Sequence, residues 1–389
     1  MGNGAVLENI IRMMAMMNTN KMCDIVITGV SGQVGSYMAE YCLNLGHRVH
    51  GVIRRTSTPN TLNYSHLISN PNFNLVHADL TDGGSIEEVV SSIKPLYFIN
   101  LAAQSFVGVS WKIPEETFNV DSLGVIRCLE AIRKSAPDCR FYNAGSSEQF
   151  GNVDYVPQDE KHPFKPRSPY GAAKCAAHHI VKVYRESYGL YAVQGLLFNH
   201  ESERRGEEFV TRKVTKGVAR IKRALIQEKE FQPIFLGNVN SHRDWSHALD
   251  FVDAIWRMLN QDTFNLELNL NHKGNHGDTR KTVELSKCIK DYVTSSDETH
   301  SIKEFVEKAF RIANIHGKWI EDTCNPTETK FETPTHILVK IDPVFYRPAE
   351  VDVLHGNSSL IRKELGWKPK IDFNGLVDKM VHNDLIIVG

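Results

Sequence analysis

Short apolar runs alternate with longer amphipathic stretches through the first half of the chain. The runs are rich in Val, Ile and Phe, as buried strands are, whereas the amphipathic stretches repeat apolar residues at helical spacing. The pattern predicts strands at 24–28, 48–53, 73–77, 97–101, 140–144 and 191–198, and helices at 36–45, 86–93, 120–134 and 170–187. Strands that alternate with helices predict an α/β fold with a doubly wound parallel sheet.

The alternation weakens after about residue 200, where loops lengthen and basic residues cluster. We therefore expect a nucleotide-binding domain at 22–198, to which segments near 240–260 and 335–345 return, and a smaller substrate-binding lobe over most of 199–389. The polar, weakly periodic stretch 264–290 suggests a surface insertion. Residues 1–21 lack a continuous apolar segment and are expected to form a flexible leader.

Composition limits the classes of partner. The 389 residues include 45 Lys and Arg against 46 Asp and Glu, and a formal charge of -1 gives no reason to expect nucleic acid or an anionic membrane as a partner. No apolar run approaches the ~20 residues of a membrane helix. The seven cysteines are scattered without metal-ligand spacing, which argues against disulfides and a metal site and favours the cytoplasm.

A glycine-rich turn follows the first predicted strand and opens the first predicted helix. Its glycines, Gly29, Gly32 and Gly35, have the GxxGxxG spacing, with Gln33 and Val34 between the last two. Such glycines let the backbone approach a pyrophosphate at a helix N-terminus, so the turn predicts a Rossmann dinucleotide site. Three glycines in an ordinary turn are the alternative.

The end of the second strand indicates which dinucleotide binds. An acid there would bind a ribose 2′-hydroxyl, but this chain has Arg54 and Arg55, whose guanidinium groups suit a 2′-phosphate. The sequence therefore favours NADP over NAD, unless both arginines are simply solvated surface residues. Further candidate cofactor contacts follow the third and fourth strands: Asp79, Leu80, Leu101, Ala103 and Ser105.

Tyr170 and Lys174 stand four residues apart and therefore share one helical face. A lysine charge, with an oxidised nicotinamide above it, stabilises a phenolate, so we expect the two together to lower the pKa of Tyr170 toward neutrality and make it a base for a sugar hydroxyl. Ser146 and Glu148 follow the fifth strand, at the edge where α/β sheets bind ligands. Removing a proton beside a transient ketone requires a carboxylate such as Glu148, although Glu148 could instead cap the following turn.

Taken together, these segments resemble the GDP-mannose 4,6-dehydratases, a family of extended short-chain dehydrogenases. The resemblance runs from about residue 23 to the C-terminus, apart from the proposed insertion. It rests on residues 29–35, 54–61, 79–82, 100–105, 166–174, 198–202, 209–213, 236–238 and 243–245, with 199–202, 204–206, 209–213 and 346–352 the most particular to this family.

The resemblance implies a catalytic cycle with tightly held NADP. Tyr170, helped by Ser146 and Lys174, would support oxidation at sugar C4. Glu148 would remove the C5 proton before water leaves from C6. It also implies that His200 and Arg205 touch NADP, and that homodimers or homotetramers form through the arginine loop. The implied contacts to the GDP-sugar are Ser105, Ser146, Asn199, Lys213, Arg243, Arg347 and Glu350.

The chain departs from the family at four places. Ser146 replaces a usual threonine, and Glu203 replaces a proline in the arginine loop. Residues 62–64 lack a cation expected near the cofactor, and Glu116 stands where a tyrosine is expected beside the nicotinamide ribose. These changes bear on cofactor affinity and on assembly through the arginine loop.

Three alternatives remain at this point. A nucleotide-sugar epimerase or 4-keto reductase would share the glycine turn, Tyr170 and Lys174, but would not need Glu148 as a base. A dehydratase acting on another GDP-sugar, such as a GDP-mannoheptose, would share every feature named so far. From another class, a non-catalytic NADP-binding protein would not need the four polar residues together.

Overall fold

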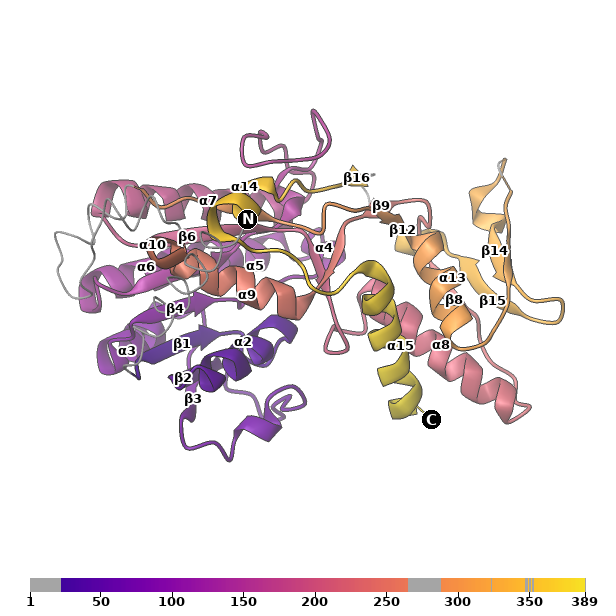
Figure 1. Cartoon of the computed structure of the whole chain (residues 1–389), viewed down its shortest axis with the longest axis horizontal. Coiled ribbons are helices and arrows are strands. Elements are labelled where there is room, and N and C mark those ends of the chain that lie inside the picture. The colour runs from indigo at the N-terminus through magenta and orange to yellow at the C-terminus, as the bar shows by residue number, and fades with distance from the viewer. Residues whose placement is uncertain are drawn as a thin grey trace, which may run out of the picture.

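A seven-stranded parallel sheet forms the centre of the larger part of the protein (Figure 1). The computed structural model describes residues 22–264, 288–322, 324–346, 349, 351 and 353–388. The strands, in sheet order, are β11 (Tyr292–Thr294), β6 (Ala192–Leu197), β5 (Arg140–Ala144), β4 (Tyr97–Asn100), β1 (Asp24–Thr28), β2 (Arg48–Ile53) and β3 (Phe73–His77). The order changes direction between β1 and β4, and doubly wound sheets bind ligands beyond the carboxyl ends of the strands at that point.

Alternate residues of each strand face two separate cores. In β1, Ile25 and Ile27 join one apolar cluster and Val26 joins the other. Helices cover both clusters, as a doubly wound sheet requires. The first face carries α2 (Gln33–Asn44), α9 (Ala248–Leu259) and α14 (Ser359–Leu365), and the second carries α3 (Gly83–Ile93), α6 (Gly124–Ser135) and α7 (Pro169–Tyr188).

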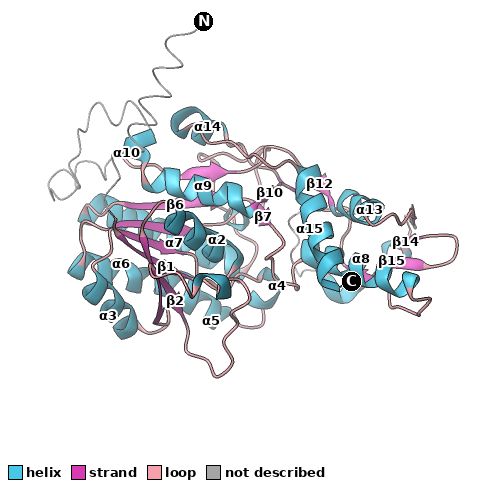
Figure 2. Ribbon diagram, turned by 60° about the horizontal axis from the view of Figure 1, so that its bottom comes forward, coloured by secondary structure: helices cyan, strands magenta, loops and turns pink. Residues whose placement is uncertain are grey.

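A smaller lobe has a core of its own, in which helices pack on a four-stranded sheet (Figures 1 and 2). Its helices are α8 (Val210–Ile226), α13 (Ile302–Ile312) and α15 (Phe373–Val388). The sheet order is β13 (Lys318–Ile320), β14 (Lys330–Glu332), β15 (Ile337–Ile341) and β8 (Ile234–Leu236). Two small sheets consist of β12 (His300–Ser301), β9 (His242–Arg243) and β16 (Val353–Leu354), and of β10 (Trp245–His247) and β7 (Asn199–Glu201).

Short helical segments connect these elements. They are η1 (Ser65–Leu67), α4 (Val107–Ser110), α5 (Pro114–Phe118), the π-helical turn η2 (Asn119–Leu123), η3 (Ser147–Gln149), α10 (Gln261–Phe264), η4 (Pro326–Glu328) and η5 (Pro343–Phe345). Within the described ranges, no helix combines the length and the apolar character needed to cross a bilayer.

The doubly wound fold is confirmed, and most predicted elements agree with the structure to within a few residues. The helix predicted at 120–134 is interrupted, because its first turn is the π-helical η2. Near 240–260, α9 packs against α2 of the nucleotide domain. The assignment of 335–345 to that domain is wrong, because β15 pairs with β8 in the sheet of the smaller lobe. The predicted leader and most of the predicted insertion at 264–290 lie outside the described residues.

Candidate active site

The glycine turn brings backbone close to backbone, which leaves no room for side chains. Gly29 has φ +68°, and a Cβ there would lie 2.8 Å from the backbone nitrogen of Ala102. A Cβ on Gly35 would lie 2.1 Å from the Gly29 carbonyl oxygen. Gly32 is the N-cap of α2. The turn therefore presents a helix N-terminus at short range, as a bound pyrophosphate needs.

A cavity of about 480 Å³ extends from this turn along the ends of β1, β2 and β4. Arg54 lines it and is exposed, whereas Arg55 is exposed without being part of its wall. Neither arginine makes an ion pair in the part of the chain that the structure describes. The other predicted cofactor residues in this wall are Gly29, Gly32, Asp79, Leu80, Leu101, Ala103 and Ser105, and Glu116 joins them.

A second cavity, of about 220 Å³, adjoins the first. Gly29, Gly32, Leu101, Ala103 and Ser105 line both cavities, so the two form one continuous crevice. All four predicted catalytic residues line the second cavity, together with several predicted cofactor and substrate residues: Ser146, Glu148, Tyr170, Lys174, Gln33, Val34, Gly35, Asn199, His200 and Arg205. The carboxyl ends of the strands have thus brought segments distant in sequence to one crevice.

Ser146 and Glu148 belong to a tight turn directly after β5. The Ser146 hydroxyl accepts a hydrogen bond from the Glu148 backbone N–H at 3.2 Å, and the Gln149 side chain accepts one from the Ser146 N–H at 2.9 Å. These two side chains make the capping box of the turn. Capping therefore comes from Ser146 and Gln149, and Glu148, which is 9% exposed, lines the cavity.

Tyr170 and Lys174 lie in the first turns of α7, which begins after the N-cap Ser168. The Lys174 Nζ donates to the Ala144 carbonyl oxygen at 3.1 Å and lies 5.6 Å from the centre of the Tyr170 ring. The surroundings that the chain itself provides oppose ionisation of Tyr170. Burial and the Asp121 carboxylate raise the pKa of the phenol, although a hydrogen bond from Ser146 lowers it. Burial also lowers the pKa of Lys174.

Asp121 is a buried carboxylate behind this pair that the sequence analysis missed. It is 1% exposed and sits in the π-helical η2, which packs against α7. Its Oδ1 accepts from the Gln104 N–H at 2.8 Å, while its Oδ2 is buried without a hydrogen-bond partner among the described residues. Burial raises the pKa of Asp121 to about 6, against the opposing charge of Lys174. The feature of the sequence that could have revealed Asp121 is an acidic residue on the buried face of the helix predicted at 120–134.

His200 lies in β7 and Arg205 in the turn that follows it, and both line the crevice. Burial lowers the pKa of His200 to about 4, so the imidazole is neutral near pH 7, and its Nδ1 lies 2.9 Å from the Phe198 carbonyl oxygen. The Arg205 guanidinium lies 3.5 Å from the centre of the Phe209 ring, and its Nε lies 3.1 Å from the buried Glu201 carboxylate.

The predicted substrate residues further along the chain are only partly described. Lys213 Nζ lies 3.4 Å from the centre of the Phe345 ring, and burial lowers its pKa. Arg243 is 6% exposed, and its Nη1 donates to the His242 carbonyl oxygen at 2.9 Å. Neither residue is in the walls of the two cavities described above. Arg347 and Glu350 lie outside the described residues.

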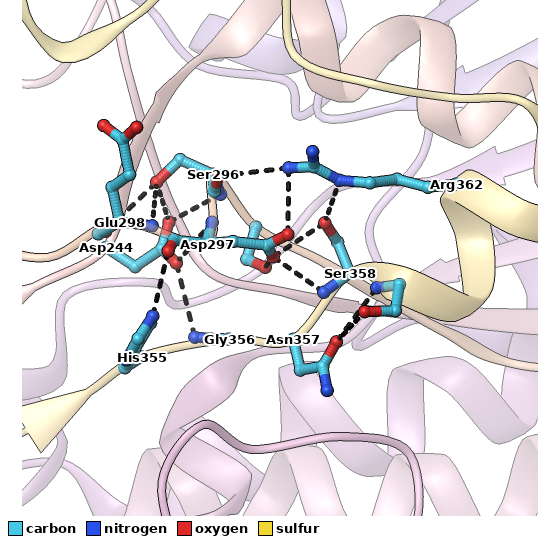
Figure 3. Close-up of polar contacts among 11 residues, drawn as sticks. Asp244, Ser296, Asp297, Glu298, His355, Gly356, Asn357, Ser358 and Arg362 are labelled. Carbon is cyan, nitrogen blue, oxygen red and sulfur yellow. Dashed lines mark hydrogen bonds and ion pairs between the residues drawn. The ribbon is translucent and has the colours of Figure 1, made fainter.

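A polar cluster fixes the backbone beside Arg243 (Figure 3). The buried Asp244 carboxylate accepts hydrogen bonds from the Ser296 N–H at 2.7 Å, the Ser296 hydroxyl at 2.6 Å and the Gly356 N–H at 3.3 Å. Asp297 in turn accepts from the backbone and hydroxyl of Ser358, both at 2.7 Å. Three separate chain segments are therefore joined where Arg243 is held.

Comparison with known proteins agrees with this arrangement. The family model of GDP-mannose 4,6 dehydratase matches residues 26–286 and 278–380. A GDP-mannose 4,6 dehydratase from Drosophila melanogaster is 42% identical over 369 residues, which cover 92% of this chain and 85% of the relative.

Solved structures agree in fold. The dTDP-glucose 4,6-dehydratase of Bacillus anthracis in complex with NAD has a TM-score of 0.69 at 20% identity, covering 93% of this chain and 96% of its own. RMD from Pseudomonas aeruginosa, complexed with NADPH, has a TM-score of 0.67 at 20% identity, and the match covers 94% of this chain and 100% of RMD. The extent of the sequence match, over a chain that brings Ser146, Glu148, Tyr170 and Lys174 to one crevice, shows that this protein belongs to the GDP-mannose 4,6-dehydratase family.

Proposed function

We propose that this protein converts GDP-α-D-mannose to GDP-4-dehydro-6-deoxy-D-mannose and water, with NADP as its cofactor. The observation that carries the proposal is the shared cavity of Glu148 and Tyr170. Tyr170 suits proton removal from a hydroxyl and Glu148 suits proton removal from carbon, and a dehydratase needs both. The family match names the same reaction class.

In this proposal the chain's own residues move protons. Tyr170 takes the proton of the sugar 4-hydroxyl, with Ser146 hydrogen-bonded to it and the Lys174 ammonium behind it. Glu148 removes the C5 proton, which the neighbouring C4 ketone makes acidic, and then gives a proton to the hydroxyl that leaves C6 as water. NADP held along the glycine turn would supply acceptance of the C4 hydride and its return to C6, and the positive charge of its oxidised form would offset the raised pKa of Tyr170. The proton that Tyr170 took from the 4-hydroxyl goes to C5 when the hydride returns, which restores Tyr170 as a base.

NADP is proposed as the cofactor because Arg54 follows β2, where the 2′-phosphate of a bound dinucleotide would be expected. Arg54 lines the larger cavity and is free of ion pairs within the described ranges. Guanidinium groups bind phosphate in a bidentate manner, whereas an unpaired arginine gives NAD no comparable advantage.

Assembly into homodimers or homotetramers, a cytoplasmic location, and contacts of Arg347 and Glu350 with GDP stay predictions.

The test is to incubate the purified protein with GDP-mannose and no added NADPH. The proposal expects a 4-keto-6-deoxy product, detected by its absorbance in strong base and by mass loss of one water. Unchanged GDP-mannose, in a protein shown to carry its cofactor, would contradict the proposal. Isomerised sugar of unchanged mass would instead support an epimerase. Parallel incubations with other GDP-hexoses and a GDP-heptose identify the preferred sugar.

A further inference from the structure

The arginine loop, residues 200–205, is bound to the glycine turn of its own chain. Gln33, the first residue of α2, reaches it twice. Its Nε2 donates to the His200 carbonyl oxygen at 2.9 Å, and its Oε1 accepts from the Ser202 hydroxyl at 2.6 Å. The loop and the turn that would carry the pyrophosphate are therefore joined by one side chain.

Arg204 binds the first turns of the same helix. Its Nη2 lies 2.7 Å from Glu40 Oε1, and its Nη1 donates to the Ser36 hydroxyl at 3.0 Å. The guanidinium carbon lies 3.9 Å from the centre of the Tyr37 ring. Ser36, Tyr37 and Glu40 fall on adjacent turns of α2, so this arginine is occupied by its own subunit.

Glu203 provides the other attachment. Its Oε2 lies 3.2 Å from Nε2 of His247, whose side chain is fully buried. The Nδ1 of this histidine accepts from the Leu249 N–H at 3.2 Å as it caps α9, so the proton on Nε2 points to Glu203. Burial opposes ionisation of Glu203, but the hydrogen bond from His247 lowers its pKa to about 2.

We infer that Glu203 is a positioning residue which, together with Arg204, fastens the arginine loop to α2 and α9 of its own subunit and so holds Arg205 against the bound dinucleotide. A proline at this position has no side chain that could bond His247. The glutamate makes cofactor retention a property of each subunit rather than of a neighbouring one. The inference rests on the proposed use of NADP.

The experiment measures how fast bound NADP leaves the purified protein. NADP release is followed by trapping in excess competing cofactor, for Glu203→Ala, Glu203→Gln and Glu203→Pro. We expect about tenfold faster release for the alanine and proline variants, because a hydrogen bond to a charged, half-buried group is lost. The glutamine, which still accepts from His247, should fall between these and the unaltered protein. Added NADP should recover the lost turnover, which places the defect in cofactor affinity.

Glu130→Ala is the matched control, since Glu130 pairs with Arg133 on α6 and is remote from the loop. It should release NADP at the unaltered rate. Diluting the unaltered protein to concentrations at which any oligomer dissociates should also leave the rate of NADP release unchanged, because the loop acts within one chain. Release that accelerates on dilution, or a folded Glu203 variant that releases NADP normally, overturns the inference. Failure of every variant and of the unaltered protein to bind any nicotinamide dinucleotide would refute the proposed function instead.

Discussion

The raised pKa of the buried Asp121 predicts that the free energy of unfolding falls as the pH rises. The pKa of this carboxyl is about 6 in the folded protein, against an ordinary value of 3.8. The folded protein therefore holds the proton more tightly than the unfolded chain, and ionising Asp121 costs stability as the pH rises through this interval. A difference of about two pH units corresponds to about 3 kcal/mol.

Asp121→Asn removes that cost, because an amide cannot ionise. The amide oxygen still accepts from the Gln104 N–H, and the desolvation of its NH₂ group is the same at every pH. The free energy of unfolding of the variant, relative to the unaltered protein, should rise by about 2.4 kcal/mol from pH 4 to pH 7, with about 1.3 kcal/mol of this above pH 5. Activity should fall at the same time, since Lys174 loses the carboxylate that raises its pKa.

The assay is denaturant unfolding of both proteins at pH 5, 6, 7 and 8, with the pH profile of dehydration measured alongside. Glu130→Gln serves as a control of opposite sign. The pKa of Glu130 is lowered to about 2 by its hydrogen bond with Arg133, so its contribution is constant above pH 5 and disappears only in acid. A stability difference for Asp121→Asn that is flat from pH 5 to pH 8 would show that Asp121 is not the buried acid described. The alkaline limit of activity should move to lower pH in this variant.

The remaining predictions concern the crevice. Gly35→Ala should abolish dinucleotide binding in a calorimetric titration, because its Cβ would lie 2.1 Å from the Gly29 carbonyl oxygen, and tight binding would contradict the backbone geometry. Arg54→Ala should weaken NADP by about tenfold or more and leave NAD almost unaffected, since one charge-assisted contact to phosphate is lost. Equal losses of affinity for NADP and NAD would show that Arg54 does not bind the 2′-phosphate. Glu148→Gln should stop release of water while C4 oxidation, seen as bound NADPH absorbance in a single turnover, persists. Full turnover by this variant would refute the role of Glu148 as the base.

The sequence by itself determined six of the seven strands of the sheet, all but β11, together with the glycine turn and the identity of the polar groups. Strand boundaries at 24–28, 48–53, 73–77 and 140–144 follow from local apolar runs bounded by turn residues, and these elements agree with the structure. Such patterns are local, because the period of apolar residues is imposed within each element by its own geometry. Ser146 and Glu148 were found because they follow a strand whose carboxyl end lies at the ligand-binding edge of the sheet, and Tyr170 and Lys174 because their spacing places them on one helical face.

Only the tertiary structure decided how those groups affect one another. Lys174 and an oxidised nicotinamide were expected to lower the pKa of Tyr170, and the fold adds burial and the Asp121 carboxylate, which act in the opposite direction. The assignment of 335–345 failed because a strand sequence does not specify its partner, and pairing with β8 places β15 in the smaller lobe. Glu203 was recognised only as a replacement for a proline in the arginine loop, and the fold brings it to His247, distant in sequence, which makes it an attachment. Burial, strand pairing and electrostatic coupling depend on residues far apart in the chain, and a local pattern carries no record of which of them will meet.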